Sequence, residues 1–250
     1  MKNYFLISVK NSIRSFAFRL YSYYERHFKH KISVYDLQAI SLIRRLPTDA
    51  VCVDIGVNEG QLFNSMYRHC KNGMLYGFEP IPDLYNYLTR KYNSPRVHLK
   101  KMVLSDTEEA VSFFYFPKRT GVSGLARRSF NQLEAKELNY TAALLDDVLK
   151  DVPRIDLVKI DVEGAELKVF RGARQTIARC RPTIIFECGY GGLEYFKGTP
   201  EEVYDFFEGI GYALSIQKAY LENHPPLDRH TFLHVFKNGY ESQYIAGPRA

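Results

Sequence analysis

Carboxylates follow three apolar runs of this 250-residue chain, at positions where they could do chemistry. Asp54 lies near the end of the first run, and Glu79 ends the second. The third run is followed by Asp161, Glu163 and Glu166. A carboxylate accepts hydrogen bonds from hydroxyl groups and can take a proton as a general base. Three carboxylates in six residues are costly at the end of a buried strand unless they are solvated, paired or used in chemistry.

The first run, residues 51–60, has the composition of a buried strand, a tight turn and a helix start. Its Val and Ile residues suit a strand covered on both faces, and Gly56 allows a turn that a Cβ would obstruct. Dinucleotide sites need G-x-G-x-x-G, whereas Gly56 and Gly60 give G-x-x-x-G. Asp54 and Glu59 put negative charge where a phosphate would sit, which favours a ligand with an ammonium or sulfonium group, such as S-adenosylmethionine. A plain strand-to-helix turn of some other α/β protein is the alternative.

The second run, residues 74–78, ends at Glu79, twenty-three positions after Gly56. In a doubly wound fold, this distance brings the end of the second strand beside the first turn, where a carboxylate can accept both ribose hydroxyl hydrogens. A solvated acid at the end of a strand is the alternative interpretation. Together, the two runs favour a site for an adenosyl ligand.

The rest of the pattern alternates strands with helices. We predict further strands over residues 96–101, 111–116, 138–143, 155–160, 182–188, 212–216 and 231–236. Helices are predicted over residues 61–70, 84–92 and 145–150, and from a threonine cap at 199 to a glycine at 209 or 211. The last two strands would form a closing antiparallel pair. The sequence therefore predicts an α/β fold with a seven-stranded, mostly parallel sheet and helices on both faces.

Two more stretches could face a ligand. Ser105 and Asp106 follow the strand over residues 96–101, whose end lies against the adenine in a doubly wound sheet, so they could accept hydrogen bonds from its amino group. Ser-Asp is also an ordinary turn dipeptide. Residues 119–124 form a glycine-containing loop that we expect to face the substrate, with a surface loop that makes no substrate contact as the alternative.

Composition and charge divide the chain into two parts. The hydrophobic content of 46% allows one α/β domain with a short extension. The four cysteines show no C-x-x-C spacing, so neither a zinc knuckle nor a disulfide framework is predicted, and a reducing compartment is expected. Residues 1–45 carry a net charge of +7 and the remainder −1, which argues against a broad nucleic-acid-binding face. We predict a basic helical arm over residues 1–45 and one domain over residues 46–250.

The arm has the spacing of a basic amphipathic helix, because apolar residues recur every three or four positions from Leu6 to Tyr24. Basic residues interrupt every window long enough to span a membrane, and the apolar run over residues 4–9 is too short for a signal peptide. The helix could dock on an anionic membrane surface or an acidic partner, or pack on the domain's own core. We expect a cytoplasmic protein, with peripheral contact at the inner face of a membrane if the arm docks there.

Five stretches in this order resemble the FkbM family of methyltransferases: residues 53–60, 77–80, 104–106, 145–147 and 159–166. The most particular is the Asp-Val-Glu-Gly-Ala-Glu sequence that begins at Asp161. Val57 stands where the family commonly has alanine. The resemblance implies a Rossmann-like class I methyltransferase fold and S-adenosylmethionine as the methyl donor. It also implies an acceptor that is usually a hydroxyl group on a sugar, a lipid-linked glycan or a polyketide.

The resemblance also assigns residues by position. It places Glu79 on the ribose, and Ser105 with Asp106 on the adenine. The residues that it assigns to the methionine end of the cofactor are Asp54, Gly56, Asn58 and Gly60. No metal site is predicted, because a D-x-E sequence without a neighbouring histidine gives little support for one.

Methyl transfer to a hydroxyl group needs alignment of the reacting atoms and a base for the proton. Asp161 is the first candidate for this base, because a carboxylate at the tip of its strand would lie beside the sulfonium. Glu163 is the second candidate, and His224 and His230 on the late loop could also serve. The alternative function is a non-catalytic adenosyl-binding or membrane-associated scaffold, against which the presence of Asp54, Glu79 and Asp161 together argues.

Overall fold

The computed structural model describes residues 33–128 and 133–249, which form one α/β unit around a seven-stranded sheet. The strand order is β3-β2-β1-β6-β7-β9-β8, and β9 alone runs antiparallel to its neighbours. The strands of this sheet are β1 (Cys52–Ile55), β2 (Leu75–Phe78), β3 (Val97–Lys100), β6 (Leu157–Ile160), β7 (Thr183–Glu187), β8 (Tyr212–Ile216) and β9 (Gln243–Pro248). The predicted fold class, with its mostly parallel sheet, is confirmed.

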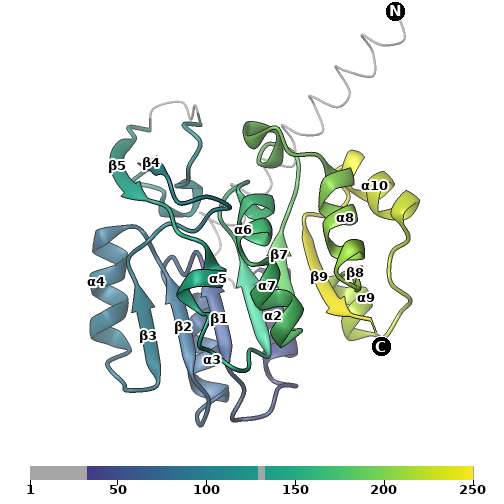
Figure 1. Ribbon diagram of the computed structural model, residues 1–250, viewed down its shortest axis with the longest axis horizontal. Helices are drawn as coiled ribbons and strands as arrows, with labels where there is room; N and C mark the ends of the chain where they lie inside the picture. Colours follow the sequence, from purple (N-terminus) through teal and green to yellow (C-terminus); the bar gives the residue numbers. More distant parts are fainter. Residues whose placement is uncertain (1–32, 129–132, 250) are drawn as a thin grey trace, which may run out of the picture.

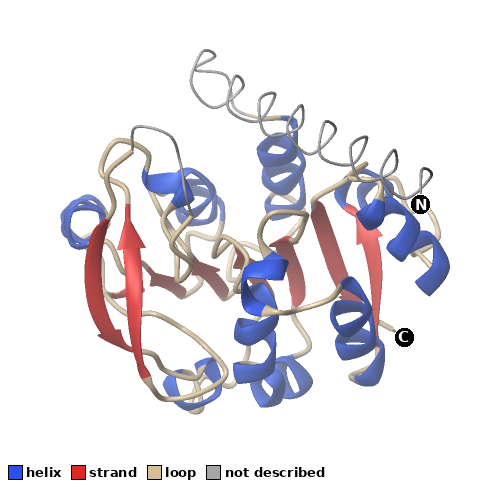
Figure 2. Cartoon of the chain, turned by 90° about the horizontal axis from the view of Figure 1, so that it is seen from above, coloured by secondary structure: helices blue, strands red, loops and turns tan. Residues whose placement is uncertain are grey.

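Helices cover both faces of the sheet, as Figure 2 shows from above. Alternate residues of the strands point to opposite faces, so β1, β2, β6, β7 and β9 each contribute to two apolar cores. One core holds Val53, Val158 and Ile184 with α5 (Leu145–Val148), α6 (Glu166–Gly172), α7 (Arg174–Cys180), α8 (Pro200–Gly209) and α10 (Arg229–Lys237). The other holds Cys52, Leu157 and Ile185 with α2 (Val34–Ile43), α3 (Gln61–His69), α4 (Pro82–Lys91) and α9 (Gln217–Leu221).

A separate antiparallel hairpin, β4 (Ala110–Tyr115) and β5 (Lys136–Thr141), lies above the carboxyl edge of the parallel strands (Figure 1). Its apolar face forms a small third core, to which Phe113, Tyr115 and Ile81 contribute. Between the two strands lies a short 3-10 helix, η1 (Thr120–Val122). Both strands were predicted within two residues of their bounds, and the structure places them outside the main sheet.

The strand predicted over residues 231–236 is wrong, because this segment is helix α10. Its Val, Phe and Thr residues favour a strand locally. However, Phe232 and Phe236 are both buried one helical turn apart, and the Asp228 side chain accepts from the Thr231 N–H as an N-cap. The burial of Phe232 and Phe236 on one face of a helix therefore overrides the local strand preference. The strand that closes the sheet beside β8 is β9.

Helix α2 belongs to the part of the chain that was predicted as an arm. Ser33 caps it, and Ala39, Leu42 and Ile43 pack into the same core as β1. The amphipathic segment from Leu6 to Tyr24 lies outside the described residues, so its docking and the division at residue 45 stay predictions. In the described ranges, no helix is long and apolar enough to cross a membrane.

Candidate functional site

The turn after β1 approaches the end of β6 so closely that only glycine fits at residue 56. Gly56 has a φ of +79°, and a Cβ there would lie 2.0 Å from the carbonyl oxygen of Asp161. A side chain would therefore separate the two central strand ends and would also be strained at this φ. Gly60, four positions later, has a φ of +81° and is the N-cap of α3. The G-x-x-x-G spacing thus builds a tight turn followed directly by a helix.

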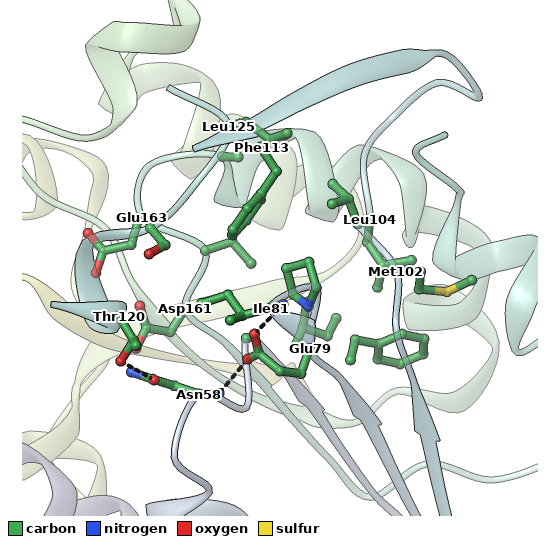
Figure 3. A pocket seen from close by; sticks show the side chains of 18 of the residues that line it. Asn58, Glu79, Ile81, Met102, Leu104, Phe113, Thr120, Leu125, Asp161 and Glu163 are labelled. Carbon is green, nitrogen blue, oxygen red and sulfur yellow. Dashed lines mark hydrogen bonds between the residues drawn. The ribbon is translucent and has the colours of Figure 1, made fainter. Parts of the chain in front are cut away.

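Glu79 joins the turn after β1 to the end of β2. Its Oε2 accepts from the Asn58 N–H at 2.7 Å, and its Oε1 accepts from the Ile81 N–H at 2.8 Å (Figure 3). The residue is only 2% exposed, and burial raises the pKa of Glu79 to about 7 against the opposing effect of the two N–H groups. Each carboxylate oxygen has a second lone pair, so Glu79 can still accept from two adjacent hydroxyl groups of a ligand.

A cavity of about 640 Å³, counting its open part, lies at this edge of the sheet. Its polar lining includes Asn58, Glu79, Asp161 and Glu163, all of which Figure 3 labels. The apolar lining comes from Phe78, Ile81, Met102, Val103, Leu104, Phe113 and Leu125. The cavity thus has carboxylates at one end and an apolar surface at the other end. This arrangement suits a ligand with a polar part and a flat, apolar ring.

At the end of β6, Lys159 lies between two aspartates. Its Nζ is 3.2 Å from Asp54 Oδ1 and 3.7 Å from Asp161 Oδ2, and it donates to the carbonyl oxygen of Gly56 at 2.6 Å. Asp54 is 1% exposed and Lys159 8%. Burial opposes a charge on Lys159, but Asp54 and Asp161 more than offset this effect and raise the pKa of Lys159 above its ordinary value. Burial also raises the pKa of Asp54, although the charge of Lys159 acts in the opposite direction. We take both groups to be ionised, because each charge lies beside a charge of opposite sign.

The turn after β6 is held by a buried carboxylate. Glu163 and Gly164 have φ values of +58° and +108°, and a Cβ at Gly164 would lie within 2.5 Å of Gly192. Oε1 of Glu166 accepts from the N–H groups of Val162 and Gly164, which closes the turn before α6. Burial raises the pKa of Glu166 to about 7. Glu166 therefore shapes the turn that presents Glu163 to the cavity.

Residues 119–128, the roof segment, cover the cavity from the hairpin side. The Thr120 hydroxyl donates to Asn58 Oδ1 at 2.8 Å (Figure 3), which ties the roof to the turn after β1. Arg128 forms an ion pair of 2.7 Å with Glu163 and also donates to the carbonyl oxygen of Glu163. The Arg128 guanidinium lies over the ring of Tyr195 at 5.6 Å. The roof segment is thus fastened near both of its own ends. The loop predicted to face the substrate lines the cavity, and its contact with a substrate stays a prediction.

The predicted site residues divide into those that line the cavity and those that support it. Gly56, Asn58, Glu79, Asp161 and Glu163 line it. Asp54 lies beneath it as the partner of Lys159, and Gly60 caps α3.

The residues predicted to contact adenine, Ser105 and Asp106, do not line this cavity. Ser105 is buried and donates to Asp106, whose carboxylate pairs with Lys168. The residues just before them, 102–104, line the cavity instead.

The two histidines considered as bases lie elsewhere. His224 and His230 are exposed, one after α9 and the other at the start of α10, and neither lines the cavity. In the described part of the chain, no group of three or more His, Cys, Asp or Glu side chains is arranged to hold a metal ion.

The sequence analysis missed three side chains of the site. Lys159 is a charged residue inside an otherwise apolar run, and that anomaly could have marked it. Thr120 lies in the loop that was expected to face the substrate. Arg128 carries no local signal, because its partner is 35 positions away.

Among curated proteins, the chain is similar to Methyltransferase 1 of Beauveria bassiana, with 29% identity over 50% of this chain and 59% of that protein. It is also similar to Methyltransferase sdnD of Sordaria araneosa, with 30% identity over 52% of this chain and 62% of that protein. The chain thus spans about three fifths of these two relatives. It is 26% identical to 2-O-methyltransferase NoeI of Sinorhizobium fredii over 79% of this chain and 83% of that protein.

A solved methyltransferase FkbM of Methylobacillus flagellatus KT has a TM-score of 0.49 and 16% identity, covering 81% of this chain and 44% of that one. The model of the methyltransferase FkbM domain matches residues 54–214. This range is more than half of the chain, and it contains Asp54, Glu79 and the turn after β6. The chain therefore belongs to the FkbM family of methyltransferases, whose cofactor is S-adenosylmethionine.

Proposed function

We propose that this chain transfers the methyl group of S-adenosylmethionine to a hydroxyl oxygen of a sugar, glycan or polyketide-type acceptor, with Asp161 as the base. The observation that carries the proposal is the position of the Asp161 carboxylate. It lines the cavity beside Gly56, it is 38% exposed, and it comes from the end of a central strand. A carboxylate in this position can take a proton from an acceptor that enters the open side of the cavity.

The residues of the cavity fit the cofactor. The carboxylate of Glu79 has acceptor sites for two adjacent ribose hydroxyls, and Met102, Val103 and Leu104 offer an apolar surface to a purine. The carboxylates of Asp54 and Asp161 supply negative charge for a cationic ligand. When bound, the cofactor supplies an activated methyl group with a good leaving group, so the chain mainly has to align the acceptor oxygen and receive its proton.

Asp161 is favoured over Glu163 as the base because the two carboxylates have different partners. Glu163 forms a short ion pair with Arg128, and its side chain is 16% exposed. Asp161 is more exposed, and its nearest cation, Lys159, lies at the longer distance of 3.7 Å. A proton placed on Glu163 would break a close ion pair, whereas the carboxylate of Asp161 is the more exposed of the two and the more accessible to an acceptor.

The acceptor class rests on three supports. The 2-O-methyltransferase NoeI is similar to most of this chain, and its name describes transfer to an oxygen. The roof segment presents Thr120, Gly121 and Ser123 to the cavity, which suits a polar acceptor. Tyr195, beside Arg128, is 49% exposed and offers an aromatic ring near the Glu163 end.

Radiolabelled methyl transfer tests the proposal. The full chain is incubated with methyl-labelled S-adenosylmethionine and a panel of sugar glycosides and hydroxylated lactones. Each acceptor is paired with its deoxy or already methylated analogue. We expect label on at least one hydroxyl compound and none on its matched analogue, with Lys218→Met as an unaffected control on α9.

Label that appears only on amine or thiol acceptors would overturn the proposal of O-methylation. Isothermal titration with S-adenosylmethionine and S-adenosylhomocysteine separates the scaffold alternative, because a scaffold need bind neither compound.

A further inference from the structure

Two of the four cysteines are in contact in the core that β1 shares with α3. Cys52 is the first residue of β1, and Cys70 directly follows α3. Their Sγ atoms are 3.7 Å apart, both residues are 0% exposed, and both thiols are free. The other two cysteines, Cys180 and Cys188, pack against the core on the opposite face of the sheet. Cys52 and Cys70 therefore form a pair of neighbouring thiols, which we call the β1–α3 thiol pair.

Arg96 holds the end of α3 in place. Its guanidinium donates to the carbonyl oxygens of Tyr67 at 2.6 Å, Cys70 at 3.1 Å and Gly73 at 3.4 Å. These oxygens belong to the last turn of the helix and the residues after it, where carbonyl groups lack partners within the helix. The Cys70 thiol is thereby kept beside Cys52 without a covalent bond.

Cys70 is the more reactive thiol of the pair. The hydrogen bond with Cys52 lowers the pKa of the Cys70 thiol, and the Arg96 guanidinium acts in the same direction, against the opposing effect of burial. The same hydrogen bond and burial raise the pKa of Cys52. The thiolate is the nucleophilic form of cysteine, so Cys70 reacts first with an oxidant. An oxidant can reach it from the end of α3, because Lys71 and Asn72 are exposed and helix ends fray.

A disulfide between these two cysteines needs only a small movement. The sulfur atoms of a disulfide are about 2.05 Å apart, so each Sγ has to move by less than about 1 Å from the present contact. We propose that the β1–α3 thiol pair is a redox modification site, in which a peroxide oxidises both thiols to one disulfide that ties the end of α3 to the start of β1. The inference does not depend on the proposed function.

The reaction balances with one molecule of peroxide. The Cys70 thiolate attacks one peroxide oxygen, the O–O bond breaks, and the other oxygen leaves as hydroxide, which forms water with the proton of the Cys70 thiol. The sulfur of Cys52 then attacks the sulfur of the sulfenic acid at Cys70. The S–O bond breaks, and the oxygen leaves as a second water with the Cys52 proton. The two thiols lose two electrons, and the peroxide gains them.

The disulfide closes a ring that contains the whole turn after β1. The two cysteines are 18 positions apart, and the chain between them includes Gly56 and Asn58. Because β1 and β2 are parallel and α3 connects them, α3 runs back toward the start of β1. Cys52 and Cys70 thus lie at the edge of the sheet opposite the cavity, which begins at the other end of β1, at Ile55. The bridge therefore restricts the unfolded chain and leaves the cavity-lining residues in place.

Limited oxidation of the full chain tests the inference. The chain is treated with a small excess of hydrogen peroxide, alkylated with iodoacetamide in denaturant and mapped by mass spectrometry. We expect a cross-link between Cys52 and Cys70 within one chain. The unfolding temperature should rise by about 5 to 10 °C, because the bridge lowers the entropy of the unfolded chain. Dithiothreitol should remove the cross-link and reverse the rise, which separates both from methionine oxidation.

Cys188→Ala is the matched control, because Cys188 is 2% exposed but packs in the other core. This variant should keep the cross-link and the rise in unfolding temperature, whereas Cys70→Ala should lose both. If Cys70→Ala fails to fold, the peptide map of the wild type still decides the inference. Affinity for S-adenosylmethionine should differ by less than about twofold between the oxidised chain and the same chain after dithiothreitol, because the bridge lies away from the cavity.

The inference is overturned if the peroxide-treated wild type keeps all its cysteines alkylated, or carries a sulfinic acid at Cys70 without a cross-link. A bridge between two chains, or one that includes Cys180 or Cys188, overturns it as well. A cross-link without a reversible rise in unfolding temperature would refute the stabilising effect. A larger reversible change in cofactor affinity would show that the bridge distorts the turn after β1.

Discussion

Two neighbouring groups of strand ends line the cavity, and they are built by different means. At the ends of β1 and β2, backbone geometry dominates: Gly56 makes the turn, and Glu79 is fixed by two backbone N–H groups. At the end of β6, side-chain charges dominate: Lys159 lies beside Asp161, and Arg128 holds Glu163. Backbone contacts fix a shape and cost little to maintain, whereas paired charges can be changed by moving one proton or one side chain.

This difference suggests a division of labour. The region made by β1 and β2 is held by backbone contacts and suits the cofactor, which is the same in every reaction cycle. The region made by β6 and the roof segment is held by ion pairs of side chains and suits the acceptor. The roof connects them, because Thr120 reaches Asn58 at one end and Arg128 reaches Glu163 at the other. Mutations at the two ends should therefore affect different kinetic constants.

The largest effect should come from Asp161→Asn. The turnover number should fall by about 10² to 10⁴, because the proton acceptor is lost while the side chain keeps its size. Affinity for S-adenosylmethionine should change by less than tenfold. Steady-state kinetics with a true acceptor, together with cofactor titration, measure both values.

If Asp161 capped a helix, asparagine should substitute well, but the N-cap position of α6 is Ala165, four residues later. Turnover close to that of the wild type would therefore move the base to Glu163.

At the other end, Glu79→Ala should weaken cofactor binding at least tenfold while leaving the fold intact. The substitution removes two hydrogen bonds to a carboxylate, each worth roughly 1.5 to 3 kcal/mol. It also frees the N–H groups of Asn58 and Ile81. Isothermal titration gives the affinity, and circular dichroism checks the fold. Unchanged affinity in a folded variant would show that Glu79 only organises the turn.

Glu166→Gln should change how stability depends on pH. In the folded chain burial raises the pKa of Glu166 to about 7, above the ordinary value of 4.5, so its neutral form is favoured. This contribution is fully present below pH 4.5 and is lost as the pH rises to 7. The difference corresponds to roughly 3 kcal/mol at most. Glutamine cannot ionise and still accepts from the N–H groups of Val162 and Gly164, so the variant should lose less stability between pH 5 and pH 8.

Thermal unfolding of the cofactor-free chain across this pH range measures the effect. Glu108→Gln, an exposed position, is the matched control. Parallel pH profiles for the wild type and Glu166→Gln would mean that Glu166 has an ordinary pKa in the folded chain.

The smallest effect should come from Thr120→Val, which removes the hydrogen bond between the roof and Asn58 with little change of shape. A neutral hydrogen bond contributes about 0.5 to 1.5 kcal/mol, so cofactor affinity should fall about two- to tenfold. Turnover at saturating cofactor should stay within about twofold of the wild type if the roof only fastens the turn. Thr107→Val removes an exposed hydroxyl outside the cavity and serves as control. A loss confined to turnover would instead assign Thr120 to the acceptor end.

Local sequence was sufficient for the turns and most of the strands. Runs of Val and Ile closed by glycine predict buried strands, and carboxylates at their ends mark the carboxyl edge of the sheet. The position of Glu79 beside the first turn was predicted because the residue directly follows the end of its strand. Its contact with a ribose stays a prediction. Local composition predicted a strand at residues 231–236, where the structure has a helix. The four-residue spacing of Phe232 and Phe236 indicates a helix only when both side chains are known to pack into the same core.

The sequence by itself determined the parallel strands β1, β2 and β6 with their turns, and with them the cavity-lining residues that follow directly from strand ends: Gly56, Asn58, Glu79, Asp161 and Glu163. Only the tertiary structure decided how their charges are matched. Lys159 meets Asp54 because β1 and β6 pair in one register, although the residues are more than a hundred positions apart. Arg128 meets Glu163 because the hairpin folds over the sheet edge. The physical reason is that strand and turn preferences depend on neighbours in sequence, whereas electrostatic partners depend on distances in space. A single sequence does not contain those distances.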